Sequence, residues 1–386
     1  MKAWTGPALA GLLLASVAVA ADTDVWIDLN LGVETQMERT EPLTDPALTQ
    51  TAGSRFNLLH HVDADVRLNL QYGLEQRLHV RRGSGLGGPG LASGAPGADY
   101  RWEDLTSNLY SSPDDDLVLT QNLDRANVQY FGTRGELSAG RQAISLGLSP
   151  QFSPMDVIMP ARISAQERSY RPGVDALRWR QPWGAFGELD LGWVQGSDQA
   201  LFVRAYQQVD RWTLEATALT VNRSEHLLGV GAQTAVGDWG LWQESAWLFN
   251  EDDSGLRLTL GADRQIFGDV YVVGEYHYNQ LGARRPDMTV LASDFYQQGL
   301  VVPWGRHYAG VQASAPVSAL TDLQAGTVIN LGDESALLTT GFQHSLTNDS
   351  RLEGTLGVPV ATRSEASASE FGLYPLTAAL NWSATF

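Results

Sequence analysis

Segments of about ten residues that alternate apolar with polar side chains recur along the chain, as in membrane-spanning strands. In the stretch 74–81, every second residue is charged or a histidine, and most of the residues between them are apolar. Successive side chains of a β-strand point to opposite faces, so each such segment has an apolar face and a polar face. Helical spacing is not sustained anywhere after residue 21. The pattern predicts an all-β fold, a transmembrane antiparallel up-and-down β-barrel that is apolar outside and polar inside.

Tight turns and longer connections alternate between these segments, with the stretch 62–69 interpreted as a strand ahead of the first turn. The predicted tight turns lie at 71–73, 132–135, 182–184, 209–211, 237–239, 267–269, 316–322 and 347–349. The predicted longer connections lie at about 39–54, 83–116, 147–173, 196–198, 222–225, 250–254, 280–304, 332–333 and 361–370. This division gives about 18 strands, with 16 as the alternative, and bacterial barrels have even numbers. Because short turns of such barrels face the periplasm, both the N-terminus and the C-terminus are predicted to be periplasmic.

The N-terminal 20 residues have the parts of a secretory signal peptide. Lys2 is followed by an apolar run from Ala8 to Ala20 that ends in small residues. This run is too short to span a bilayer as a helix, which needs about 20 apolar residues. We therefore expect a signal peptide over 1–20 and the transmembrane barrel over 21–386.

The last predicted strand, 376–386, places its apolar residues on one face and ends at Phe386. A terminal phenylalanine after alternating apolar residues resembles the signal that the barrel-assembly machinery reads in outer-membrane proteins. The resemblance implies that Leu380, Trp382 and Phe386 form this assembly signal. It also implies the bacterial outer membrane as the location of the chain.

The charge balance narrows the expected partners. The chain has 26 Lys+Arg against 44 Asp+Glu, and Lys2 is its only lysine. Nucleic acid is not an expected partner, because phosphate binding needs a basic face. Without cysteine, the chain can form neither a disulfide nor a lipoprotein anchor. The expected partners are outer-membrane lipid, lipopolysaccharide, the barrel-assembly machinery and a small solute; the oligomeric state stays open, with a monomer favoured.

Charged residues at inward strand positions would line the lumen. A barrel of this width leaves an aqueous interior unless loops fill it, and wall charges then set its selectivity. The predicted pore-lining residues are Arg67, Arg77, Arg81, Arg125, Arg141, Arg178, Arg180, Glu188, Asp190, Arg204, Arg257 and Glu275. Four of the arginines, at 141, 178, 180 and 204, would form a basic wall that Glu188 and Asp190 partly neutralise. Alternatively, these charges pair with one another and simply hold the wall.

The segment 145–173 is the candidate constriction loop. It is long and contains four prolines, which restrict its freedom and suit a loop folded into the barrel. Its charged residues are Asp156, Arg162, Glu167, Arg168 and Arg171. The alternative is a surface loop that faces outward.

Three stretches around this loop resemble a porin-like segment. They are a Gly-Arg-Gln strand at 140–147, the loop residues 152–156 and a strand at 170–178 that contains Gly-Val-Asp-Ala-Leu-Arg. Together they resemble the alginate-export type of porin. The resemblance implies an eighteen-stranded porin-like barrel.

These features favour a passive outer-membrane channel for small polar or anionic solutes, with saccharides among the candidates. The alternative is a structural, adhesin-like or enzymatic barrel with a plugged lumen. The sequence has neither an H-E-x-x-H nor a G-x-S-x-G motif, so no enzyme activity is expected. No cofactor and no metal site are expected either.

Overall fold

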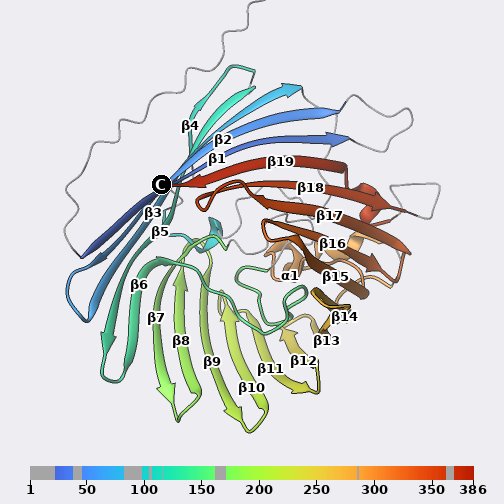
Figure 1. Ribbon diagram of the computed structural model, residues 1–386. Coiled ribbons are helices and arrows are strands. Elements are labelled where there is room, and N and C mark those ends of the chain that lie inside the picture. Colours follow the sequence, from blue (N-terminus) through green and yellow to red (C-terminus); the bar gives the residue numbers. More distant parts are fainter. Residues whose placement is uncertain are drawn as a thin grey trace, which may run out of the picture.

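The computed structural model describes residues 22–37, 46–81, 98–103, 107–114, 116–160, 171–284, 287–361 and 369–386 (Figure 1). Within these ranges, 18 strands form a closed antiparallel ring, because each pairs with the next and the last pairs with the first. The ring consists of β1 (Thr23–Met37), β2 (Ala47–His61), β3 (Val66–Arg81), β5 (Leu117–Gly132), β6 (Gly135–Gln142), β7 (Val174–Trp183), β8 (Gly187–Gln195), β9 (Gln199–Val209), β10 (Trp212–Val221), β11 (Glu225–Val236), β12 (Trp239–Phe249), β13 (Ser254–Ile266), β14 (Val270–Asn279), β15 (His307–Ser318), β16 (Thr321–Asn330), β17 (Ser335–Ser345), β18 (Ser350–Val360) and β19 (Leu376–Thr385). The predicted fold and strand number are confirmed.

A nineteenth strand belongs to the sheet but not to the ring. β4 (Ser107–Ser111) pairs with β5 beyond the point where β6 ends, so it extends that wall without adding to the closure. The helical turns are short: η2 (Ala98–Tyr100), η3 (Met288–Ala292), α1 (Asp294–Gln297) and η5 (Phe371–Leu373). In the part of the chain that the structure describes, no helix is long and apolar enough to cross a bilayer.

The two faces of the strands follow the predicted alternation. On β13, Leu260 is half exposed on the outer face, whereas Arg257 and Thr259 are buried inside. A shift of one residue would turn every side chain of a strand to the other face. An arginine facing mid-membrane lipid costs about 2–4 kcal/mol, so the alternation fixes the register strongly.

The first hairpin differs from the prediction. The expected turn at 71–73 is wrong, because β3 runs through these residues with only a register shift between Gln71 and Tyr72. The turn lies at 62–65, where Asp63 Oδ1 accepts hydrogen bonds from the backbone N–H groups of Asp65 and Val66, both at 2.8 Å. Aspartate favours turns for this reason, and its side chain does not point into the lumen here.

The connection predicted at 39–54 is also too long, since β2 already begins at Ala47. The other predicted tight turns lie where the structure has short connections. These turns lie at the same end of the barrel as the start of β1 and the end of β19. There, the backbones of Phe386 and Ile27 form two hydrogen bonds of 2.9 Å with each other. The periplasmic location of this end stays a prediction.

Two of the long connections fold into the barrel instead of away from it (Figure 1). Residues 143–160 and the described residues of the second connection, 280–284 and 287–306, meet the inner faces of β7 to β12 in one buried apolar cluster, which includes Met155, Phe202 and Phe295. Each fully buried side chain of this size contributes about 1.5–3 kcal/mol. The cluster therefore fills one side of the lumen with packed protein.

Candidate functional site

Glu244 on the inner face of β12 holds the first inner loop. Its Oε2 accepts hydrogen bonds from the backbone N–H groups of Leu148 and Ser149, both at 2.8 Å. Its Oε1 accepts from the hydroxyl of Ser153 at 2.5 Å and from the N–H of Met155 at 3.1 Å. Hydrogen bonds to a carboxylate are shorter and stronger than neutral ones. One carboxylate thus fixes both limbs of the loop.

Glu275 and Arg257, two predicted lumenal residues, hold the same loop from neighbouring strands. Glu275 Oε2 accepts from the N–H of Phe152 at 2.9 Å. Arg257 Nη1 donates to the carbonyl oxygens of Pro154 at 3.1 Å and Leu300 at 3.4 Å, which joins the two inner loops. Both residues point inward as predicted, but they contact the loops and not open solvent.

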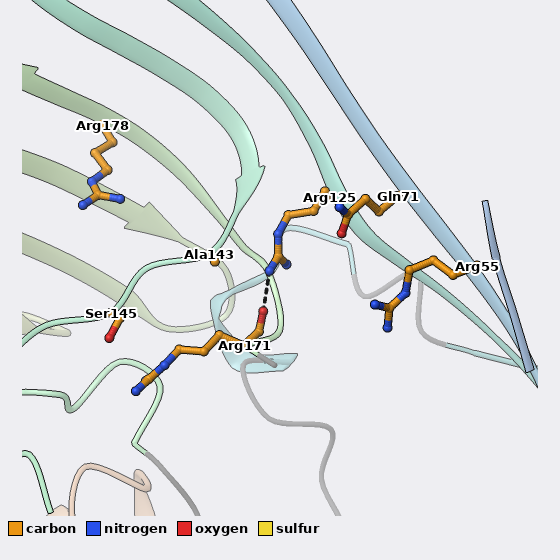
Figure 2. Close-up of a pocket in the computed structure, with 7 residues that line it drawn as sticks. All are labelled: Arg55, Gln71, Arg125, Ala143, Ser145, Arg171 and Arg178. Carbon is orange, nitrogen blue, oxygen red and sulfur yellow. Dashed lines mark hydrogen bonds between the residues drawn. The ribbon is translucent and has the colours of Figure 1, made fainter. Parts of the chain in front are cut away.

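A cavity of about 590 Å³ lies beside the first inner loop (Figure 2). It lies between strands β2, β3, β5 and β7 and the loop residues that follow β6 and precede β7. The lining residues are Arg55, Gln71, Arg125, Ala143, Ser145, Arg171 and Arg178. Four of these seven are arginines and none is an acid, so the cavity presents positive charge to anything inside it.

Three of the cavity arginines are each paired with a buried aspartate. Arg178 makes a two-pronged contact with Asp190, with N···O distances of 2.8 Å and 2.6 Å. Arg125 Nη1 lies 2.6 Å from Asp124 Oδ2, and Arg171 Nη1 donates to Asp156 Oδ2. Of the predicted arginines, Arg125, Arg171 and Arg178 line the same cavity.

Arg171 connects the inner loop with the barrel wall. Its guanidinium also donates to the carbonyl of Met159 at 2.8 Å, and its own carbonyl accepts from Arg125 Nη2 at 2.5 Å (Figure 2). Burial raises the pKa of its partner Asp156 to about 7, although the neighbouring Arg171 acts to lower it.

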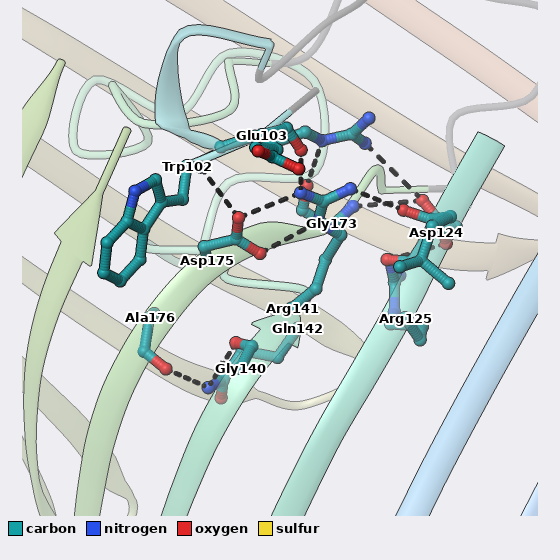
Figure 3. Close-up of polar contacts among 12 residues, drawn as sticks. Trp102, Glu103, Asp124, Arg125, Gly140, Arg141, Gln142, Gly173, Asp175 and Ala176 are labelled. Atoms are coloured by element: carbon teal, nitrogen blue, oxygen red, sulfur yellow. Dashed lines mark hydrogen bonds and ion pairs between the residues drawn. The ribbon is translucent and has the colours of Figure 1, made fainter. Parts of the chain in front are cut away.

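Arg141, predicted as part of the basic wall, lies outside this cavity. Its guanidinium is buried and contacts Asp175 through two hydrogen bonds of 2.8 Å and 2.9 Å (Figure 3). It also donates to the carbonyls of Leu123 at 2.9 Å and Glu103 at 2.6 Å. Arg141 thus ties β5, β6 and β7 to the chain ahead of β4, so its position favours the alternative that this charge holds the wall.

The remaining predicted wall residues are mostly paired. Arg180 contacts Glu136 at 2.5 Å, and Arg204 contacts Glu215 at 2.8 Å and 2.9 Å. Glu188 lies on β8 opposite Pro182, toward the short-turn end.

Near the start of the barrel, Arg77 contacts Glu75 at 2.6 Å, and Arg67 lies 4.9 Å from the centre of the Phe131 ring. The side chain of Arg81 lies outside the described residues, as do the loop residues Arg162, Glu167 and Arg168.

Gln71, Arg55 and Glu244 were not among the predicted site residues. Gln71 lies in the misplaced turn at 71–73, and Arg55 lies in the middle of β2 and not just after a connection that was predicted to end at residue 54. Glu244 shares the inward face of β12 with Trp242, Ala246 and Leu248, so apolar–polar alternation does not mark it as a lumenal residue. Its hydrogen bonds to a loop almost 100 residues earlier in the chain could not be predicted from the sequence either.

At the C-terminus, Leu380 is half exposed on the outer face of β19, and Trp382 lies opposite Leu31 on β1. The ring of Phe386 is largely exposed at the short-turn end. These positions leave the three residues accessible, and their role as an assembly signal stays a prediction.

No protein-family model and no curated protein matches the sequence. Several solved structures are similar in fold. The outer membrane protein OprD from Pseudomonas aeruginosa has a TM-score of 0.57 at 8% identity, over 95% of this chain and 93% of that one. Acinetobacter baumannii OccAB4 has a TM-score of 0.56 at 9% identity, over 95% and 98%.

Pseudomonas aeruginosa OccK5 (OpdH) has a TM-score of 0.57 at 10% identity, over 95% of this chain and 97% of that one. These structures are not alginate-export porins, so that resemblance stays a prediction. At this level of identity the likeness shows the fold, and the chain has the same kind of barrel as OprD and the Occ proteins.

Proposed function

We propose that the chain is an outer-membrane channel for the passive passage of small polar solutes, with anions preferred. The single observation that carries the proposal is the cavity inside a closed barrel, lined by four arginines and no acid. Charged side chains on an inner wall set the selectivity of a pore. Arginine in particular matches the planar geometry of carboxylate and phosphate groups.

The outer surface supports a membrane location. Large apolar side chains are exposed on the outward face of successive strands, for example Val203, Leu214, Leu228 and Leu241. Such a band costs free energy in water and matches the hydrocarbon core of a bilayer. We assign the short-turn end to the periplasm, with lipid, lipopolysaccharide and the barrel-assembly machinery as partners and a monomer as the working unit.

In this proposal, residues 143–160 form the constriction. Glu244, Glu275 and Arg257 hold the loop against one side of the wall, which leaves the cavity on the side of β2 to β7. An acidic saccharide fits both the arginine lining and the resemblance of 140–178 to the alginate-export type.

The competing function is a plugged barrel with a structural, adhesin-like or enzymatic role. The packed cluster that fills one side of the lumen is the observation that favours it. Transport and plugging differ in one measurable property, the ion current through a single barrel.

Single-channel recording of the purified barrel in a planar bilayer separates them. We expect discrete conductance steps and, in a KCl gradient, a reversal potential that shows preference for chloride over potassium. Arg55→Gln should lower that preference by about twofold, because a lining charge is lost. Arg264→Gln, which removes an arginine paired with Asp238 outside the cavity, is the matched control. Absence of steps above background would favour the plugged barrel.

A further inference from the structure

The aspartates that pair with the cavity arginines are buried and do not line the cavity. The side chains of Arg125 and Arg178 are each 13% exposed and that of Arg171 is 26% exposed. Their partners Asp124, Asp156 and Asp190 are at most 2% exposed, and none of them lines the cavity. A solute in the cavity therefore meets the guanidinium groups first and the carboxylates only at a greater distance.

This arrangement weakens the attraction for an anion without abolishing it. Coulomb energy falls inversely with distance, so a carboxylate at about twice the distance of the guanidinium cancels about half of its attraction. A channel needs binding that lets a solute enter and also lets it leave. The charge on each buried aspartate thus determines how strongly its arginine holds an anion.

Asp156 differs from the other two because it lies on the inner loop. Asp124 and Asp190 lie on β5 and β8 of the wall. The backbone N–H of Asp156 donates to the hydroxyl of Ser153 at 3.1 Å, within the turn that Glu244 holds.

The charged groups that face Asp156 come from three elements. Arg171 contacts it from the end of the loop, Glu244 faces it from β12 and Arg257 from β13. Glu244 and Arg257 are already engaged with the loop backbone. Among the described residues, Arg171 alone both pairs with Asp156 and lines the cavity.

We propose that Asp156 is a selectivity-determining residue that acts from behind the cavity wall: its carboxylate tunes the attraction of Arg171 for an anion without touching the solute. The inference rests on the proposed channel function and adds a regulation by pH. Asp156 is a positioning residue, since it acts only through Arg171.

The direction of the pH effect follows from the proton balance. Burial raises the pKa of Asp156 to about 7, so the carboxylate takes up a proton as the pH falls through neutrality. The positive charge of Arg171 is then no longer compensated. Anion preference should therefore rise on acidification, and fall again above neutral pH.

Reversal potentials in a KCl gradient at pH 5.5 and pH 8.5 test this with the full-length barrel. We expect the wild-type channel to be more chloride-selective at pH 5.5. Asp156→Asn should make the channel equally selective at both values. At pH 8.5 its chloride-to-potassium permeability ratio should exceed that of the wild type by about twofold to threefold, the effect of one uncompensated charge at the wall.

Asp238→Asn is the matched control, because it removes the same charge from an exposed aspartate at the β11–β12 turn. It should behave like the wild type at both pH values. If Asp156→Asn also keeps the wild-type pH profile, the inference is overturned. A wild-type channel without chloride preference would instead refute the proposed function, so the two failures are distinguishable.

Arg171→Gln keeps the inference testable if Asp156→Asn does not assemble. At pH 5.5 the aspartate is protonated and Arg171 acts unopposed, so its removal should lower chloride preference there by a similar factor. An unchanged ratio at pH 5.5 would overturn the role of the pair.

Discussion

Single carboxylates determine the shape of the lumen. Glu244 accepts four hydrogen bonds from the inner loop, and two of them come from residues on each limb of the turn. A buried group with this many donors is costly to remove, because each donor loses its partner in a site that water does not reach freely. The loop position therefore depends on one side chain more than on loop composition.

We expect Glu244→Ala to release residues 143–160 from the wall. The loss of charge-assisted hydrogen bonds should destabilise the docked loop by about 2–5 kcal/mol. Open-channel noise should increase, and the loop should become sensitive to a protease that leaves the wild-type loop intact. Glu251→Gln, at an exposed acid in the β12–β13 connection, should change neither property. A protease-resistant Glu244→Ala barrel would contradict this view.

At the scale of elements, a second buried acid joins the long connections at the end opposite the short turns. Glu370, just ahead of η5, accepts hydrogen bonds from the hydroxyl of Tyr308 on β15 and from Asn330 Nδ2 on β16 at 2.8 Å. Its own N–H donates to Asp333 Oδ2 at 2.7 Å. Three segments distant in sequence thus meet at one side chain.

Burial raises the pKa of Glu370 to about 8, well above its value in an unfolded chain. Between these two values the folded state binds more protons, so the junction should lose stability as the pH rises from about 5 to 8. Glu370→Gln should remove this dependence and protect the junction at pH 8, as measured by hydrogen–deuterium exchange of residues 369–375. Asp349→Asn at the opposite end should retain the wild-type profile. Exchange is compared as a protection factor, the intrinsic rate at each pH divided by the measured rate, and equal protection factors of the wild type at pH 5 and pH 8 would show that Glu370 does not titrate here.

At this scale, strand faces could be predicted from the sequence, but one of the turns and the contacts between distant segments could not. Alternation specifies strand faces wherever lipid lies on one side, so the inward position of Arg257 on β13 could be predicted. At 71–73 a tyrosine followed by glycine resembles a turn, but the cross-strand pairs of β2 and β3 continue through it. Local composition cannot reveal such pairing, because it is decided by residues on another strand. The partners of Arg141 and Glu244 were unpredictable for the same reason.

The whole molecule is closed by the pairing of β1 with β19, which runs from Asp28–Thr385 to Met37–Leu376. Closure gives each of the 18 strands of the ring a partner on both sides, and an open edge between β1 and β19 would be costly in lipid. If the assembly machinery recognises the end of β19, as proposed, it would do so before this strand completes the ring. The ring of Phe386 remains largely exposed even afterwards.

We expect Phe386→Ala to reduce assembly more than stability. The backbone hydrogen bonds between Phe386 and Ile27 survive this substitution, so barrels that do assemble should unfold at nearly the wild-type temperature. The yield of heat-modifiable barrel in outer membranes should fall several-fold. Phe267→Ala removes an even more exposed phenylalanine ring from the β13–β14 turn and should leave the yield unchanged. Equal losses in both variants would argue for a general effect of exposed aromatic rings.

The off-centre position of the cavity has a consequence for how such a chain can change. One boundary of the cavity is the sheet, whose strands also form the lipid-facing surface and the pairing that closes the ring. The other boundary is the loop 143–160, which lies inside the barrel and is held by hydrogen bonds to Glu244, Glu275 and Arg257. Replacement of this loop alone, with the three side chains that hold it retained, would give a barrel with the same lipid-facing surface and a different solute selectivity.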